Sequence, residues 1–274
     1  MMARDVALLL ADVDGTLVTD DKALTEEAKR AVGAMRAAGI RLALTSGRPP
    51  RGIRMLTAPL AIDTPIAGFN GGVMVEPDLE TVVVSHRLAR DDARRAVSLM
   101  EEHGLDPWVY TSKRWLIRDP KAAHVDKEAG TVQFDADVVE DFDDDALADA
   151  VKITGVTDDR DRMAKCHEAA QGAFHSDVTA DLSQPYYLDV THRRANKGEV
   201  VIELAQRLRI PERRIATIGD MPNDIAMFER SGFSIAMGHS SGEVKEAASA
   251  VTDSNEENGF AKAIWRFILE REAA

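Results

Sequence analysis

The sequence is poor in cysteine and has no long apolar segment. Its single cysteine, Cys166, cannot form an internal disulfide, so a disulfide-stapled scaffold is excluded and a reducing, cytoplasmic location is expected. No run approaches the roughly 18 uncharged apolar residues of a membrane span. The N-terminal segment meets an acid at Asp5 before its first apolar run, which is unlike a signal peptide. We therefore expect a cytoplasmic protein without a membrane partner.

Basic residues are outnumbered by acidic ones. The chain has 34 Lys and Arg against 47 Asp and Glu, a net charge of −13. Nucleic acid is not an expected partner, because polyanions bind basic surfaces. Residues 86–189 hold 13 bases and 23 acids, a net of −10, so the excess is local. A small anionic substrate remains compatible with this charge, since the local field at the site decides binding.

Several common functional patterns are also missing. There is no internal repeat, no low-complexity linker, no G-x-G-x-x-G fingerprint and no G-x-x-x-x-G-K-[ST] loop. The seven histidines are scattered, and the pair Cys166-His167 has no second cysteine or histidine at metal-ligand spacing. A dinucleotide site, a P-loop and a thiolate metal centre are therefore not supported, and no pattern predicts an oligomeric state.

Apolar runs and amphipathic segments alternate in both halves of the chain. A short buried strand, an amphipathic helix and another buried strand in succession predict a right-handed crossover and a mostly parallel sheet. The expected strands are 6–11, 40–45, 66–69, 214–219 and 233–237, and the expected helices are 25–38, 196–208, 223–231, 244–248 and 259–270. The predicted fold class is α/β, with a doubly wound, Rossmann-like parallel sheet.

The middle of the chain has a different texture. It contains one helical segment, 91–103, and short alternating segments such as 115–118 and 132–134, separated by polar stretches. We expect an α+β domain inserted into the α/β core. The predicted division is a core of residues 1–85 and 190–274 with an insert of residues 86–189. The acidic run 135–149 is expected to be a solvated loop and helix.

Two carboxylates follow the first strand, in Asp12-Val13-Asp14-Gly15-Thr16. In open α/β sheets, functional groups gather at the carboxyl ends of strands. Two acids in one crevice repel each other unless a cation or a proton intervenes. The pattern therefore indicates a divalent metal or an acid/base pair. The alternative is an Asx turn with Asp14-Gly15 at a hairpin corner.

A second acidic set, Asp220-Met221-Pro222-Asn223-Asp224, follows another buried strand. Asp224 is expected to face back from the first turn of the next helix. Converging carboxylates without cysteine or clustered histidine favour Mg²⁺ over Zn²⁺. Helix capping by Asn223 or Asp224 is the alternative, and it is compatible with a metal site.

Two further features suit an anion. Thr45-Ser46-Gly47-Arg48 follows the second strand and offers hydroxyls and backbone N–H groups to phosphoryl oxygens. Lys197 lies at the start of a helix, where its charge opposes the helix dipole. A lysine in that place suggests a nearby anion or carboxylate.

These motifs, in this order, resemble those of the haloacid dehalogenase-like phosphatases. The motifs are DVDGT (12–16), TSGR (45–48), NKG (196–198) and GDMPND (219–224), and the long insert resembles the large α+β cap of the Cof-type subfamily IIB sugar phosphatases. The loop FNGG (69–72) and the segments AMG (236–238) and VTDSN (251–255) extend the resemblance over the core. His239 is a departure, because asparagine commonly follows Met-Gly in the family.

The resemblance implies Mg²⁺-dependent hydrolysis of a small phosphorylated metabolite such as a sugar phosphate. Asp12 would form an aspartyl-phosphate, and Asp14 would act as the acid and base. Mg²⁺ would be held by the Asp12 carboxylate, the Asp14 carbonyl and Asp220, with support from Asn223 or Asp224. The expected phosphate and substrate contacts are Thr45, Ser46, Gly47, Arg48, Asn70, Lys197 and Asn223.

Three alternatives remain open. A sugar phosphomutase shares the fold and the paired aspartates. A phospho-accepting receiver module also combines acids, a hydroxyl, a lysine and Mg²⁺, but it needs only about 120 residues and has its acceptor on a later strand, where this chain has Thr45. A binding protein with an inactive site is the third.

Overall fold

Eight strands form one sheet, and this sheet is the centre of the larger domain. The structure is a computed structural model, and it describes residues 5–174 and 176–270. The strand order is β14-β13-β12-β1-β2-β3-β4-β5. Its parallel part comprises β1 (Leu8–Asp12), β2 (Arg41–Thr45), β3 (Ile66–Gly68), β12 (Ile215–Gly219), β13 (Phe233–Ala236) and β14 (Ala250–Val251). The antiparallel strands β4 (Val73–Val75) and β5 (Val82–Ser85) extend one edge.

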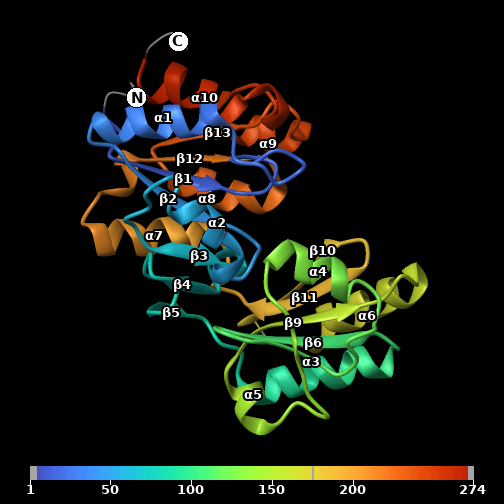
Figure 1. The fold of residues 1–274 in the computed structure, drawn as a ribbon. Coiled ribbons are helices and arrows are strands. Elements are labelled where there is room, and N and C mark those ends of the chain that lie inside the picture. The colour runs from blue at the N-terminus through green and yellow to red at the C-terminus, as the bar shows by residue number, and fades with distance from the viewer. Residues whose placement is uncertain (1–4, 175, 271–274) are drawn as a thin grey trace.

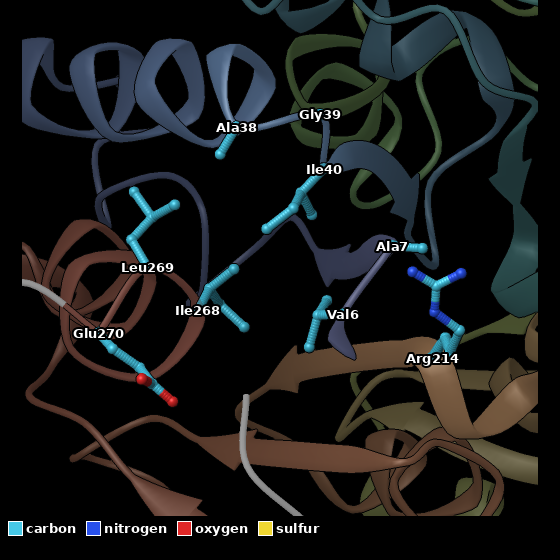
Figure 2. A pocket seen from close by; sticks show the side chains of 9 residues that line it. All are labelled: Val6, Ala7, Ala38, Gly39, Ile40, Arg214, Ile268, Leu269 and Glu270. Carbon is cyan, nitrogen blue, oxygen red and sulfur yellow. The ribbon is translucent and has the colours of Figure 1, made fainter. Parts of the chain in front are cut away.

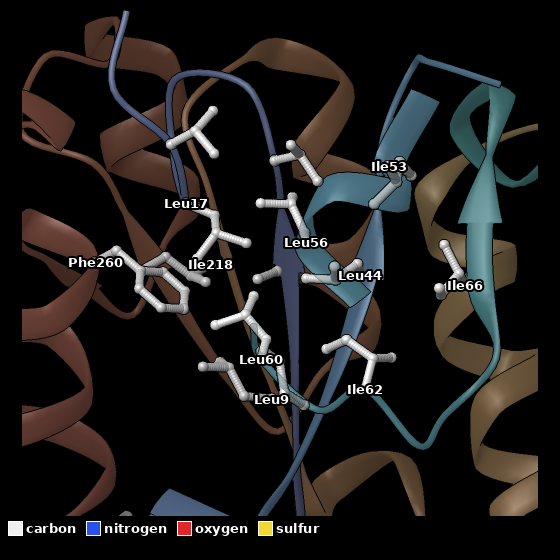
Figure 3. Packing of buried hydrophobic residues seen from close by; sticks show 14 of the residues in the cluster. Leu9, Leu17, Leu44, Ile53, Leu56, Leu60, Ile62, Ile66, Ile218 and Phe260 are labelled. Atoms are coloured by element: carbon white, nitrogen blue, oxygen red, sulfur yellow. The ribbon is translucent and has the colours of Figure 1, made fainter. Parts of the chain in front are cut away.

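Helices cover both faces of this sheet (Figure 1). Alternate strand residues point to opposite faces, as the period of two requires. Leu9, Leu44 and Ile218 belong to the apolar cluster under α1 (Glu26–Ala37), α2 (Arg54–Thr57), α10 (Gly259–Ala263) and the π-helical turn Ile264–Ile268 (Figure 3). Leu8 and Leu10 pack in a second cluster under α7 (Lys197–Leu208), α8 (Ile225–Arg230) and α9 (Gly242–Ala247). The sheet is therefore doubly wound, as predicted.

The helix ends follow the expected local chemistry. The Thr25 hydroxyl accepts the Ala28 N–H at the start of α1, and Gly39 follows its end with φ of 81°. The Asn196 side chain accepts the Glu199 N–H at the start of α7. The Glu199 carboxylate pairs with Arg194.

A second sheet lies between β5 and α7 in the sequence and forms a separate layer (Figure 1). Its order is β10-β11-β9-β6-β7-β8, with bounds β6 (Asp106–Thr111), β7 (Trp115–Ile117), β8 (Asp137–Val138), β9 (Ala150–Val156), β10 (Val178–Gln184) and β11 (Tyr187–His192). The helices α3 (Arg90–Glu102), α5 (Asp144–Ala148) and α6 (Arg160–Ala173) cover its outer face, whereas α4 (Val125–Val132) lies on the side facing the core. The expected α+β insert is confirmed as a fold; we call this layer the cap. The domain boundaries at residues 86 and 189 stay a prediction. The first and last residues of the predicted core, 1–4 and 271–274, lie outside the described part.

Two expected elements differ from the structure. Residues 132–134 do not form a strand, because Val132 ends α4 and Gln133 has the left-handed φ of 62° that terminates it. The expected helix 259–270 is α-helical only to Ala263 and then widens into the π-helical turn. Three residues that alternate between apolar and polar, such as Val132-Gln133-Phe134, do not distinguish a short strand from the end of a helix.

The acidic run 135–149 contains β8 and α5, and several of its acids bind arginines of the cap. Asp137 pairs with Arg114, and Asp149 pairs with Arg87. The predicted loop-and-helix surface is therefore correct in outline, but the run also supplies an edge strand. Within residues 5–174 and 176–270, no helix combines the length and apolarity that a bilayer span requires.

Candidate active site

The predicted site residues meet at the carboxyl ends of three adjacent strands. Strand β1 is central, with β12 on one side and β2 on the other. Asp12 is paired in register with Thr45 at the end of β2, and Asp220 follows Gly219 at the end of β12. The chain continues from β1 toward one edge and from β12 toward the other, so these ends form the topological switch point.

Four buried charged side chains form an ion cluster there. The Lys197 ammonium donates to Asp12 Oδ1 at 2.6 Å and to Asp224 Oδ1 at 2.5 Å. Oxygens of Asp12, Asp220 and Asp224 all lie within 4.8 Å of one another. Lys197 is only 2% exposed. The lysine that opposes the dipole of α7 thus has the carboxylate partners that its position suggested.

Burial sets the protonation behaviour of this cluster. Desolvation raises the pKa of Asp12 well above its usual value, Lys197 opposes the rise, and Asp224 and Asp220 add to it. Desolvation likewise raises the pKa of Asp220. For Lys197, burial lowers the pKa, but Asp12 and Asp224 outweigh burial and the pKa lies above its usual value. The ammonium is therefore held charged between carboxylates that lack full compensation.

Asp224 is fixed by the loop that carries Asp220. Its Oδ2 accepts the backbone N–H groups of Asp220 at 2.8 Å and Met221 at 2.9 Å, while Oδ1 binds Lys197. It faces back from the 3₁₀ turn Pro222–Asp224 that precedes α8, as predicted. Because both oxygens are engaged, Asp224 braces the loop and the lysine.

Asp14 points into a different set of contacts. Arg48 donates to it through Nε at 2.8 Å and Nη2 at 2.6 Å, and Lys22 Nζ lies 2.8 Å from Oδ1. Burial alone raises the pKa of Asp14, but the hydrogen bonds and charges of Arg48 and Lys22 outweigh it and hold the pKa below the usual value. Asp12 ends β1 and Asp14 lies two residues further on, yet their carboxylates have separate partners.

Gly15 lets this loop turn beside Asp220. Its φ of 75° lies in the left-handed region, and a Cβ built there would lie 2.5 Å from Asp220 Oδ2. The requirement for glycine between the two acidic loops is therefore both conformational and steric.

The remaining predicted residues line the other side of the site. Thr45 Oγ1 is buried and has no hydrogen-bond partner among the described residues. Ser46 Oγ accepts the Arg48 N–H at 3.1 Å, and Asn70 Oδ1 accepts a hydrogen bond from Asn223 at 3.2 Å. A Cβ on Gly47 would lie 3.7 Å from Asn70 Oδ1. The loops after β2, β3 and β12 are therefore in contact, and the buried Thr45 hydroxyl beside them has no protein partner among the described residues.

Three neighbours of the acids were not predicted. Thr16 donates to Asp220 Oδ1 at 2.9 Å, and His239 Nε2 lies 3.5 Å from Asp220 Oδ2. Lys22 is the third, through Asp14. Thr16 belongs to the DVDGT motif and His239 stood out as a departure, so both carried a signal. Lys22 lies in a polar loop, and no sequence pattern there indicates a residue of the site.

The acidic set fits a hard divalent cation. Three carboxylates face one ammonium, so the buried site carries two excess negative charges when all three acids are ionised. All candidate ligand atoms are oxygens, the donor type of Mg²⁺. A divalent cation would offset these charges and oppose the rise in the pKa of Asp12 that burial and the neighbouring carboxylates cause.

A hollow at the other end of the sheet is not part of this site. It has a volume of about 550 Å³ and lies at the amino end of β1, among Val6, Ala7, Ile40, Arg214 and Ile268 (Figure 2). Functional groups of parallel sheets gather at the carboxyl ends. The acids and Lys197 therefore lie at the opposite ends of the strands from this hollow.

The profile of the haloacid dehalogenase-like hydrolases matches residues 9–264. The protein YxeH of Bacillus subtilis is 29% identical, with 96% of this chain and 99% of the relative covered. The 5-amino-6-(5-phospho-D-ribitylamino)uracil phosphatase YcsE of the same organism is 25% identical, with 97% of each chain covered.

Solved structures have the same architecture. A haloacid dehalogenase-like hydrolase from Bacteroides thetaiotaomicron superposes with a TM-score of 0.87 at 25% identity, covering 95% of this chain and 99% of its own. The subclass IIB sugar phosphatase BT4131 gives a TM-score of 0.79 at 20% identity over 96% of this chain and 99% of its own, and so supports the fold. The chain belongs to the haloacid dehalogenase-like hydrolases and is a phosphatase of their Cof-type branch, as its motifs predicted.

Proposed function

We propose that this phosphatase is a Mg²⁺-dependent phosphomonoester hydrolase that acts through an aspartyl-phosphate on Asp12. The observation that carries the proposal is the buried cluster in which Lys197 links Asp12 to Asp224 beside Asp220. A carboxylate held at a strand end, next to a fixed cation and a site for a second one, suits nucleophilic attack on a phosphoryl group.

Asp12 would attack phosphorus through a carboxylate oxygen. The new bond joins that oxygen to phosphorus, and the bond from phosphorus to the alcohol oxygen breaks. Water then attacks phosphorus, the bond to Asp12 breaks, and inorganic phosphate leaves. Two displacements replace one difficult attack by water.

Asp14 would move the proton in both steps. It would protonate the departing alcohol oxygen and later accept a proton from the attacking water. The first role needs the protonated carboxyl, which release from Arg48 and Lys22 would favour, and the second needs the ionised carboxylate, which those contacts favour. A halide needs no protonation on departure, so the presence of Asp14 favours phosphoryl transfer over dehalogenation.

The phosphoryl oxygens would contact the chain on the β2 side. The buried Thr45 hydroxyl has a free donor, and the Lys197 ammonium lies next to the attacking carboxylate. Both would offset charge that grows in the transition state. Ser46, Gly47, Arg48, Asn70 and Asn223 stay candidates for substrate contacts.

Asp12, Asp220 and the Asp14 carbonyl would hold Mg²⁺, with Asn223 or Asp224 in support. Asp224 suits an indirect role because its oxygens bind Lys197 and two backbone N–H groups. When bound, the ion would neutralise charge between the carboxylates and the phosphoryl group.

We propose a small phosphorylated metabolite, such as a sugar phosphate, as the substrate class. One relative is named for a phosphorylated ribityl compound, and a structural neighbour is named a sugar phosphatase. Nucleic acids and membranes are not proposed as partners.

The test is phosphate release from a panel of phosphorylated metabolites with Mg²⁺. Asp12→Asn should lower kcat/KM by at least about a thousandfold while the circular dichroism spectrum is unchanged, because the nucleophile is lost. Asp21→Asn is the control, since it removes an exposed carboxylate from the same loop region. Substantial turnover by Asp12→Asn would remove Asp12 from the nucleophile role.

The same assay separates hydrolase from mutase. A hydrolase releases inorganic phosphate in step with the free alcohol. Conversion of a sugar phosphate into its isomer, with no phosphate released, would replace the proposal by a phosphomutase.

A further inference from the structure

The chain passes between core and cap twice, and a histidine lies at each passage. His86 follows β5, where the chain leaves the core, and His192 ends β11, where the chain returns to it. The two rings stack, with centroids 5.7 Å apart and planes inclined by 22°. We call residues 86–89 and 192–196 the two linkers. The histidine pair therefore brings the two linkers into contact.

Backbone hydrogen bonds tie the first linker to both layers. The His86 N–H donates to the Gly72 carbonyl of the core at 2.8 Å. Two residues further on, the Leu88 N–H donates to the Ala150 carbonyl of the cap at 2.9 Å. Movement of the cap relative to the core must therefore change the backbone between these two bonds, directly beside the stacked rings.

The hydrogen bonds of the pair favour neutral rings. His192 Nδ1 accepts the Arg194 N–H at 3.1 Å, so the neutral ring carries its proton on Nε2. Protonation of His192 would place a second N–H at Nδ1, and the Arg194 N–H would lose its acceptor. His86 Nε2 is buried and has no hydrogen-bond partner within the part of the chain that the structure describes. A proton there would be a buried donor without an acceptor, which is costly.

The charges around the pair act in the same direction. Burial lowers the pKa of His86, and the charges of Arg194 and His192 lower it further. Glu203 and Glu199 oppose this shift without outweighing it, and both pair with Arg194, at 3.3 and 3.0 Å. A free imidazole has a pKa of about 6.5. Because the pKa of the stacked ring is lower, the contact is fully stable above pH ~6.5 and weakens as the pH falls below that value.

We propose that His86 and His192 form an acid-sensitive clamp, in which neutral rings hold the two linkers together and protonation separates them. Two imidazolium rings at this distance repel each other beside the charge of Arg194, and the backbone of the second linker loses the acceptor at Nδ1. The attachment of the cap is thus firm at neutral pH and loosened in acid. This inference is independent of the chemistry proposed for Asp12.

Amide hydrogen exchange at pH 7.5 and 5.5, corrected for the intrinsic effect of pH, tests the clamp. A ring that stays neutral in the clamp and titrates near pH 6.5 when released makes release about tenfold more frequent at pH 5.5 than at pH 7.5. Protection of the His86 and Arg194 N–H groups should fall by about this factor in the wild type. Equal protection of these amides at the two pH values would overturn the proposal.

Two substitutions remove the titrating groups and keep the local contacts. His86→Phe retains a ring that stacks, and His192→Asn retains an oxygen that accepts the Arg194 N–H. In the double variant, protection of the Arg194 N–H should change by less than about twofold between the two pH values. His167→Asn is the control, because that ring contacts Gln171 within α6, and it should keep the tenfold fall. A tenfold fall in the double variant would refute the clamp, since acid would then act elsewhere.

Nuclear magnetic resonance of the wild type tests the clamp without any variant. The ring resonances of His86 should titrate below pH 6.5, because the stacked ring resists protonation. Titration of this ring at or above pH 6.5 would overturn the proposal, whatever the stability of the double variant. Neither measurement requires turnover, so the outcome is distinct from success or failure of the proposed function.

Discussion

At the scale of single residues, Lys197 shows how an unfavourable local position can indicate function. An ammonium at the start of a helix opposes the dipole, and burial adds a desolvation penalty. Asp12 and Asp224 offset both, and hold the lysine charged. The partners come from β1 and from the loop after β12, so their number and identity required the fold.

Lys197→Met should both unfold the protein more easily and impair catalysis. It leaves buried carboxylates without their cation, which we expect to lower the free energy of unfolding by about 3–5 kcal/mol. It should also reduce phosphate release by about a hundredfold or more, since transition-state charge loses a stabilising group. Urea titration and initial rates measure the two effects.

The control is Lys262→Met, which removes an ion pair with Asp253 whose side chains are about half exposed. Exposed pairs contribute at most about 1 kcal/mol, so this variant should be nearly neutral. Equal destabilisation by both substitutions would contradict the role assigned to the buried cluster.

At the scale of elements, the ends of β1, β2 and β12 place the chemistry. The apolar runs predicted the bounds of these strands closely. A strand buried on both faces is a continuous apolar run, so the polar residues that flank it mark its two ends. The pattern predicted that Asp224 faces back toward the end of β12, but not that its oxygens bind Lys197 and the N–H groups of Asp220 and Met221. These bonds depend on how the loop folds back, and Gly219 makes room for the carboxylate.

Gly219→Ala should disturb that loop. A Cβ there would lie 2.3 Å from Asp224 Cγ and 2.5 Å from Oδ2, so the carboxylate must leave its backbone donors or Lys197. We expect a loss of about 1–3 kcal/mol in unfolding free energy. The accompanying loss of phosphate release should exceed about tenfold, because the displaced carboxylate also positions Lys197.

Gly33→Ala is the control, and we expect it to raise the free energy of unfolding rather than lower it. Its Cβ meets no atom within 4 Å, and alanine in the interior of α1 should stabilise the protein by about 0.5–1 kcal/mol. Thermal unfolding of both variants compares them directly. A stabilised Gly219→Ala with full activity would show that the loop relaxes freely.

At the scale of the whole molecule, the negative charge is distributed between two places with different consequences. Most of it lies in residues 86–189, where acids such as Asp137 and Asp149 pair with cap arginines at the surface. The other place is the buried site, where the three carboxylates Asp12, Asp220 and Asp224 have only one cationic partner, Lys197. Net charge alone does not reveal this buried excess.

Mg²⁺ should therefore stabilise the whole fold. An ion that binds only the native state adds about 2.7 kcal/mol at a hundred times its Kd. The melting temperature of the wild type should rise on replacing a chelator with saturating Mg²⁺. Asp220→Asn should lose most of that rise while keeping its fold. An identical shift in both proteins would place the ion outside this cluster.

The sequence by itself determined the α/β core, the order of the motifs and the residue types at the strand ends. These follow from short-range patterns: buried runs, caps and acids that interrupt apolar segments. It also predicted that Asp12 and Asp220 share a site, because parallel strands bring their carboxyl ends together, and the resemblance of the motifs implied that Lys197 joins them.

Only the tertiary structure decided the pairing. Asp14 binds Arg48 and Lys22 rather than joining the buried acids, and Arg48 reaches the cap at Thr131. In the alternating segment 132–134, Val132 and Gln133 end the helix that makes this contact. Side-chain partners far apart in sequence depend on loop conformation and on how the cap packs on the core, and neither leaves a periodic signal in the chain.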